Sequence, residues 1–129
     1  MRVGAGFAAV FAVAAYLSAP NQTVNSLSLG LGVGGTAGLL YVGSVAAAMR
    51  GVRALYVPVG EDWAWNAFLP ALAYATLLAM AALCRRELQY SLYGVGTVSV
   101  ALLFIGIHNA WDVAVWNSIK HQNDSKSDK

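Results

Sequence analysis

Two ionisable residues four positions apart, His108 and Asp112, are the residues best placed in this chain to do chemistry. Residues at i and i+4 share one face of a helix, so the two side chains are neighbours, and Asn109 lies beside them. An imidazole next to a carboxylate can bind a metal ion, act as a general base or brace a helix. The pair therefore predicts a polar site, and a metal ion on His108 and Asp112 is one interpretation of it.

A second group of polar residues flanks the third apolar stretch of the chain. Glu61 and Asp62 come just before that stretch and Asn66 just inside it, while Arg50 and Arg53 follow the second stretch. Because consecutive helices of a bundle run antiparallel, these residues return to the level of the histidine. We expect ligand-binding residues there, and the candidates are His108, Asn109, Asp112, Glu61, Asp62, Asn66, Arg50 and Arg53.

Three interpretations of this polar cluster stay open. In the structural one, acidic residues at a helix N-terminus pair with the arginines, and the histidine and aspartate lock the last helix in place. In the second, the cluster binds a small polar ligand or a lipid head group at the membrane interface. In the third, the histidine and its neighbouring carboxylates form a catalytic centre with iron, manganese or zinc. No cofactor is predicted beyond such a metal ion, and an enzyme is the less favoured interpretation.

The composition is typical of a membrane protein. Of the 129 residues, 58% are hydrophobic and 11% are charged, whereas a soluble domain has about 25% charged residues. The mean hydropathy is +0.57. The net charge of +2 comes from scattered residues, with no basic stripe that could bind nucleic acid. These values exclude most soluble enzymes, disordered tails and nucleic-acid binders, and the one cysteine, Cys84, cannot form an intramolecular disulfide.

Four apolar stretches are close to the length of about 20 residues with which a helix crosses a bilayer. They cover residues 3–19, 27–49, 65–84 and 88–107, the last with an apolar extension to 119, and residues 120–129 form a polar tail. We therefore predict an all-α fold with one domain, residues 1–119, that forms an up-and-down bundle of four transmembrane helices. The first stretch ends in Ser18-Ala19-Pro20, so a cleaved signal peptide is the alternative to a retained helix.

The lysines and arginines predict that both termini are cytoplasmic. With four spans, the N-terminus, the second loop and the tail share one side, and that side holds six basic residues against two. They are Arg2, Arg50, Arg53, Lys120, Lys126 and Lys129 against Arg85 and Arg86. The expected location is the cell inner membrane, as a multi-pass protein. The depth of His108 stays open, because the fourth stretch is longer than one bilayer.

Small residues at four-residue spacing predict where the helices pack. Helices in lipid associate through close backbone approach, which small side chains permit. The expected helix-packing residues are Gly30, Gly34 and Gly38 in the second stretch and Ala67, Ala71, Ala75 and Ala79 in the third. These faces are expected to touch neighbouring helices of the same bundle, and a homodimer seam is the alternative.

Two segments of the second half of the chain resemble small bacterial four-span membrane proteins of uncharacterised function. One is the run His-Asn-Ala-Trp-Asp at 108–112, within the segment 104–112 near the end of the last helix. The other is Tyr-Val-Pro-Val-Gly-Glu-Asp-Trp at 56–63. The resemblance implies a four-helix protein of the inner membrane and implies no activity.

The function expected from these observations is that of a small integral membrane protein. It would act as a scaffold or accessory subunit, or bind a small ligand or lipid at its cytoplasmic rim. One alternative is a membrane-embedded enzyme that uses a metal or cofactor at His108 and Asp112, and another is a small transporter or channel. The expected partners are membrane lipid and a homo-oligomer or larger membrane assembly, with no nucleic acid.

Overall fold

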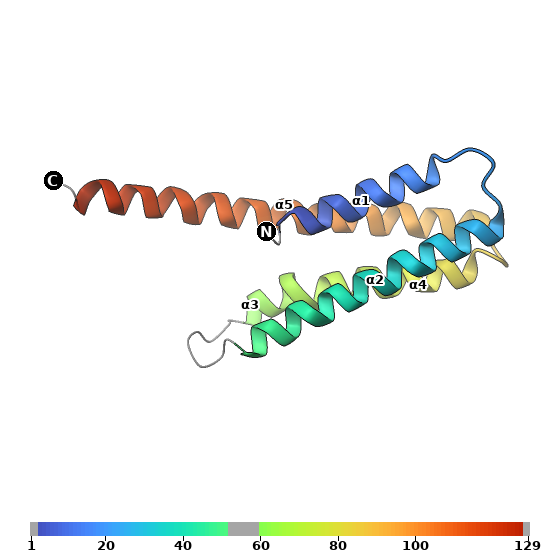
Figure 1. The fold of residues 1–129 in the computed structure, drawn as a ribbon, viewed down its shortest axis with the longest axis horizontal. Coiled ribbons are helices and arrows are strands. Elements are labelled where there is room, and N and C mark those ends of the chain that lie inside the picture. The colour runs from blue at the N-terminus through green and yellow to red at the C-terminus, as the bar shows by residue number, and fades with distance from the viewer. Residues whose placement is uncertain (1–2, 52–59, 128–129) are drawn as a thin grey trace.

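The computed structural model describes residues 3–51 and 60–127, and every element there is a helix. In chain order the elements are α1 (Val3–Leu17), α2 (Val24–Gly51), α3 (Gly60–Trp63), the π-helical segment η2 (Ala64–Phe68), α4 (Leu69–Leu83) and α5 (Leu88–Ser127). Because α3, η2 and α4 follow one another without a break, they form one helical rod. Four rods therefore run up and down (Figure 1). The all-helical expectation is confirmed for the described residues.

Three of the helices are long and apolar enough to cross a membrane. The segments are Val24–Gly51, Ala64–Leu83 and Leu88–Asn123, and each contains an apolar window of 18 residues, with mean hydropathies of 1.5, 1.6 and 1.8. The first rod, α1, has 15 residues, which corresponds to a length of about 22 Å. It is therefore the short rod of the bundle.

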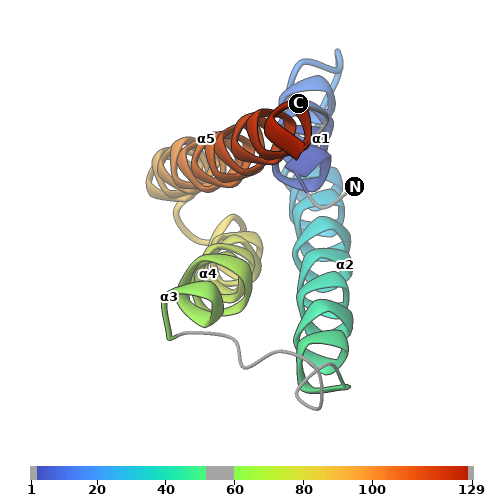
Figure 2. The ribbon, with the colours of Figure 1, turned by 90° about the vertical axis from the view of Figure 1, so that its left-hand side faces the viewer.

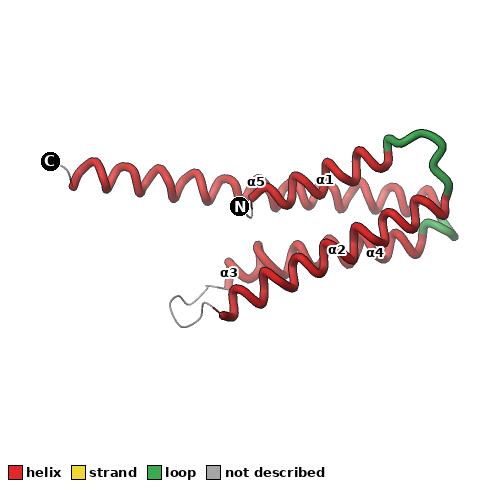
Figure 3. The backbone as a smooth tube through the Cα atoms, viewed as in Figure 1, coloured by secondary structure: helices red, strands yellow, loops and turns green. Residues whose placement is uncertain are grey.

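The two ends of the bundle differ in construction. The described loops, residues 18–23 and 84–87, are short and lie together at one end, called here the far end (Figure 3). At the other end α1 begins at Val3, α2 ends at Gly51 and α3 begins at Gly60, and this end is called the rim. Figure 2 shows the rods from the rim, with α1 and α5 on one side and α2 and α4 on the other.

The seam between α2 and α4 is the most extensive helix contact. Its buried residues on α2 are spaced three or four apart, which keeps them on one face of a helix. On α4 the spacing of the buried residues is similar. The buried residues are Leu27, Leu31, Gly35, Gly38, Val42, Val45 and Met49 on α2, and Ala73, Tyr74, Leu77 and Ala81 on α4.

Gly35 allows the closest backbone approach in this seam. A Cβ atom built on Gly35 would lie 3.2 Å from the backbone oxygen of Tyr74 and from the backbone nitrogen of Leu78, and 2.9 Å from the Leu78 Cγ. Any larger residue would therefore push the two backbones apart.

The three glycines expected to share one packing face are divided between two neighbours. Gly30 receives the ring of Tyr16 from α1, Gly38 receives the ring of Tyr74 from α4, and Gly34 is exposed. The cause is geometric, because each step of four residues advances about 400° around a helix, a drift of about 40°. Glycines four apart therefore turn progressively from one neighbour toward the next.

The alanines on the third rod drift in the same way. Ala67 is buried and Ala71 is half-buried, whereas Ala75 and Ala79 are exposed. The drift from Ala67 to Ala79 amounts to about 120°, which carries the stripe off the seam. The observed packing face of α4 thus differs from the expected alanine face and centres on Leu77.

The first helix is an integral part of the bundle. It packs chiefly along α5, where the ring of Phe7 lies 3.4 Å from the position of a Cβ on Gly106. Its corner with α2 is held by side chains: the Tyr16 hydroxyl donates to the Ser26 carbonyl, and Gln22 Nε2 donates to the Tyr16 carbonyl at 2.8 Å. In the structure, α1 thus packs against α5 and is joined by side-chain hydrogen bonds to the start of α2.

Polar contacts between helices are concentrated near the far end. The Ser91 hydroxyl donates to the Met80 carbonyl at 2.7 Å, and the Ser28 hydroxyl donates to the Ala81 carbonyl at 2.8 Å. Ser91 is fully buried. These bonds tie α5 and α2 to the last turns of α4.

The last helix, α5, is much longer than the bundle that it belongs to. Its 40 residues span about 60 Å at 1.5 Å per residue. The first half of α5 packs into the bundle, with Val95, Val98, Leu102 and Ile105 buried. In its second half, residues 111–123 are all exposed. The second half therefore projects beyond the rim as a single straight helix (Figure 1). Most of the polar tail, expected from residue 120, continues this helix to Ser127.

Candidate functional site

A π-helical turn at the rim positions the residue that contacts His108. In η2 the backbone N–H of Leu69 donates to the carbonyl of Ala64, five residues earlier. Pro70 follows directly and has no N–H for the carbonyl of Asn66, while its ring crowds that carbonyl, so the preceding turn widens. The sequence cause of the wide turn is thus Pro70, and Trp65 lies within that turn.

The centre of the candidate site is a stack of two aromatic rings from different rods. The imidazole of His108 on α5 and the indole of Trp65 on η2 are nearly parallel, with an interplanar angle of 5° and ring centroids 3.7 Å apart. A protonated imidazole in this position would gain cation–π attraction from the indole. The stack joins the third rod to α5 at the level of the rim.

Asp112 lies one helical turn beyond the stack. Its Oδ2 atom is 3.3 Å from the Nδ1 atom of His108, which is the distance of an ion pair when the ring is protonated. The same Nδ1 atom is buried and has no aligned hydrogen bond. The contact is therefore Coulombic rather than a directed hydrogen bond. The His108 side chain is 31% exposed and that of Asp112 is 63% exposed, so the pair is open to a ligand from outside.

The other candidate residues differ in their burial and in their interaction partners. Asn109 and Asn66 are half-buried, and Asn66 already has an interaction partner. Glu61 on α3 and Arg50 in the last turn of α2 are exposed. Arg53 and the side chain of Asp62 lie outside the described residues. Thus the structure brings together Asp112, His108 and a tryptophan, while Arg50 and Glu61 form no ion pair with any described residue.

The donor set of the site gives limited support to a metal centre. His108 and Asp112 supply one nitrogen and one carboxylate side by side. Among the side chains that the structure describes, which do not include those of Asp62 and Asp124, no three histidine, cysteine, aspartate or glutamate residues gather in a way that could hold a metal ion. Cys84 is buried at the far end, away from the rim.

Trp65 is absent from the residues that the sequence predicts for the site, because a tryptophan near the end of an apolar stretch usually lies at a membrane interface. A simple count could have found it. Two antiparallel helices joined by a tight turn place residues at equal distance from that turn side by side. Trp65 lies 21 residues before Arg86, the middle of the turn 85–87, and His108 lies 22 residues after it.

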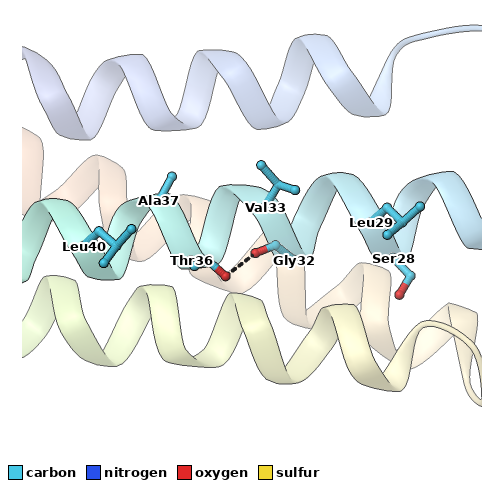
Figure 4. A pocket seen from close by; sticks show the side chains of 7 residues that line it. All are labelled: Ser28, Leu29, Gly32, Val33, Thr36, Ala37 and Leu40. Carbon is cyan, nitrogen blue, oxygen red and sulfur yellow. Dashed lines mark hydrogen bonds between the residues drawn. The ribbon is translucent and has the colours of Figure 1, made fainter.

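A shallow furrow lies on the outer face of α2, near the middle of the bundle (Figure 4). Its lining residues all come from α2: Ser28, Leu29, Gly32, Val33, Thr36, Ala37 and Leu40. The Thr36 hydroxyl donates to the Gly32 carbonyl at 2.8 Å, within the same helix. Both hydroxyls of the lining are already bonded to backbone carbonyls, Ser28 to that of Ala81, so the furrow offers little chemistry.

The chemistry of the rim therefore follows from its own residues: a half-exposed imidazole stacked on an indole, with a carboxylate at ion-pair distance. Such a site can bind an anion when the ring is protonated, or accept a donor when it is neutral. It can also simply hold two helices together. Comparison of the chain with protein-family models, curated proteins and solved structures found no match.

Proposed function

We propose that the protein is a multi-pass protein of the cell inner membrane, whose four rods cross the bilayer and whose termini are both cytoplasmic. Three helices with the length and hydropathy of membrane spans support this placement. The described basic residues support the orientation, since Arg50, Lys120 and Lys126 lie at or beyond the rim. Arg85 and Arg86, in contrast, lie in the tight turn at the far end.

Within that membrane the protein acts as a scaffold or accessory subunit, and the length of α5 carries this proposal. The bilayer core is about 30 Å thick, half the length of α5. The bundle therefore fills the core while residues 111–123 extend past the rim. Trp111, Trp116 and Ile119 are 70%, 62% and 54% exposed there. Large apolar side chains outside both bilayer and bundle are typical of a protein–protein interface.

Site-specific photo-crosslinking in cells tests the accessory role. A photoreactive amino acid at Trp116 is expected to give an adduct with a protein, either a second copy or a larger membrane protein. The matched control is Leu72 on α4. Its side chain is also exposed and apolar, but it lies on the surface of the bundle and not beyond the rim. Adducts from both positions with lipid alone would contradict the accessory role.

A second function is favoured by the rim cluster, namely the binding of a small ligand or lipid. Its support is the half-exposed stack of His108 on Trp65, beside a carboxylate that leaves Nδ1 without a hydrogen bond. Native mass spectrometry of the protein in mild detergent would show a discrete added mass that the His108→Ala variant lacks. If the wild-type protein carries no added mass, or if every mass that it carries persists in the variant, this function is contradicted.

A further inference from the structure

A separate hollow lies at the rim, between α2 and the third rod. The contact of the third rod with α5 is on the opposite side of that rod. Small residues form its floor and walls, with Gly43 and Ala46 from α2 and Ala64 and Ala67 from the third rod. Trp63 and Phe68 stand along the third-rod side. The lining is almost wholly apolar. The hollow is therefore an apolar groove between two helices, open toward the surroundings of the bundle.

The groove is open where glycine and alanine line it. A Cβ atom built on Gly43 would meet no atom within 4 Å. Phe68 is 67% exposed, so its ring borders the groove without covering it. In a bilayer, such a groove takes up whatever apolar chain lies beside it, and the commonest one is a lipid acyl chain.

A cation stands at the rim end of the groove. Arg50 follows Gly43 and Ala46 at spacings of seven and four, so it lies on the same face of α2, one turn nearer the rim. It is exposed and forms no ion pair with any residue that the structure describes. Glu61 is adjacent to the lining residue Gly60 but lies about 100° further round its helix. The groove thus runs from an apolar interior toward the end of α2 that carries Arg50.

We propose that this groove binds an anionic glycerophospholipid of the bilayer, with one acyl chain along Gly43 and Ala46 and the phosphate at Arg50. Basic residues at the cytoplasmic ends of grooves between membrane helices are typical head-group sites. Trp63 contributes the amphipathic ring that favours the head-group level. The site rests on the proposed function in one respect, that the bundle crosses the membrane, and it is separate from the stack of Trp65 on His108.

Native mass spectrometry of the full chain tests this site. The protein is taken from mild detergent with equal amounts of phosphatidylglycerol and phosphatidylcholine. The wild-type protein is expected to retain phosphatidylglycerol preferentially. Arg50→Gln is expected to reduce this preference about fivefold, the effect of one basic residue near a head group. The matched control, Arg85→Gln, removes an exposed arginine at the far end and should leave the preference unchanged.

A second pair of variants tests the acyl-chain part of the groove. Gly43→Leu fills open space and should reduce the retention of both lipids. Gly96→Leu also fills open space, on α5 outside the groove, and should retain both. Equal retention of the two lipids by the wild-type protein, or identical behaviour of Gly43→Leu and Gly96→Leu, would overturn the lipid site. A protein mass in place of the lipid would assign the groove to a partner helix and also overturn it.

The failure of this site can be distinguished from the failure of the proposed function. If the chain does not fractionate with membranes, the membrane placement itself is wrong. If it does so and binds the two lipids equally, only the lipid site is wrong.

Discussion

The imidazole of His108 lies flat on the indole of Trp65, with ring centroids 3.7 Å apart and planes 5° from parallel. These two residues come from different rods, so their contact couples the position of α5 to the wide turn that precedes Pro70. The stack is therefore both a structural clamp at the rim and the centre of the candidate ligand site.

Removal of the Trp65 indole tests whether the stack stabilises the fold more than an exposed tryptophan does. Trp65→Ala is expected to lower the free energy of unfolding by at least about 0.5–1.5 kcal/mol, the contribution of an aromatic pair beyond its buried area. The measurement is thermal unfolding in detergent. Trp111→Ala is the control, because Trp111 is 70% exposed beyond the rim. Equal losses in the two variants would show that the stack contributes no specific stability.

Replacement of the imidazole by a benzene ring separates stability from ligand binding. His108→Phe keeps an aromatic ring on Trp65 but removes both ring nitrogens and the Coulombic contact with Asp112. The thermal midpoint is expected to stay near that of the wild-type protein, while the added mass that His108→Ala removes is also lost. A retained ligand mass would show that the histidine nitrogens are not its binding atoms.

The seam between α2 and α4 is expected to reject even one extra methyl group at Gly35. Gly35→Ala places a Cβ atom 3.2 Å from two backbone atoms of α4, and such overpacking costs about 1–3 kcal/mol. Gly96→Ala, where the added atom meets nothing within 4 Å, is the control and should unfold like the wild-type protein. Unfolding in denaturant-supplemented detergent compares the two, and equal stability would contradict the close approach.

The bond from Ser91 to Met80 is expected to matter more than a hydroxyl within one helix. Ser91→Ala removes a fully buried bond between α5 and α4 and should cost about 0.6–1.7 kcal/mol. Thr97→Ala removes a bond to Tyr93 on the same helix and should cost little. If both variants lose the same free energy of unfolding, the hydrogen bond between α5 and α4 contributes no more than one within a single helix.

Much of the architecture could be predicted from hydropathy, because the lipid-crossing length of a helix leaves a clear signature in apolar runs. The helix bounds 24–51 and 69–83 overlap the expected stretches 27–49 and 65–84. Hydropathy could not predict the end of α5, since no turn signal interrupts the helix between residue 107 and the polar tail. The helix therefore continues through residues that were expected to be a tail.

The packing face and the site partner could not be predicted from residue spacing alone. The glycine repeat divides between Tyr16 and Tyr74, because a four-residue step drifts around the helix and large rings fill the spaces that glycines leave. The residue type of Trp65 gives no hint of the stack, since a tryptophan near a helix end usually lies at the membrane interface. Only the similar distances of Trp65 and His108 from the turn at Arg86, 21 and 22 residues, indicate the stack.

The most direct test of the accessory role is the mass of the intact protein released from its own membrane in mild detergent. We expect the 13.5 kDa chain to be found in a complex of higher mass, with a second copy or another membrane protein. A double variant, Trp116→Ser with Ile119→Ser, is expected to release the single chain from that complex. A single 13.5 kDa chain in the wild-type protein, or a complex that the double variant leaves intact, would contradict the accessory role.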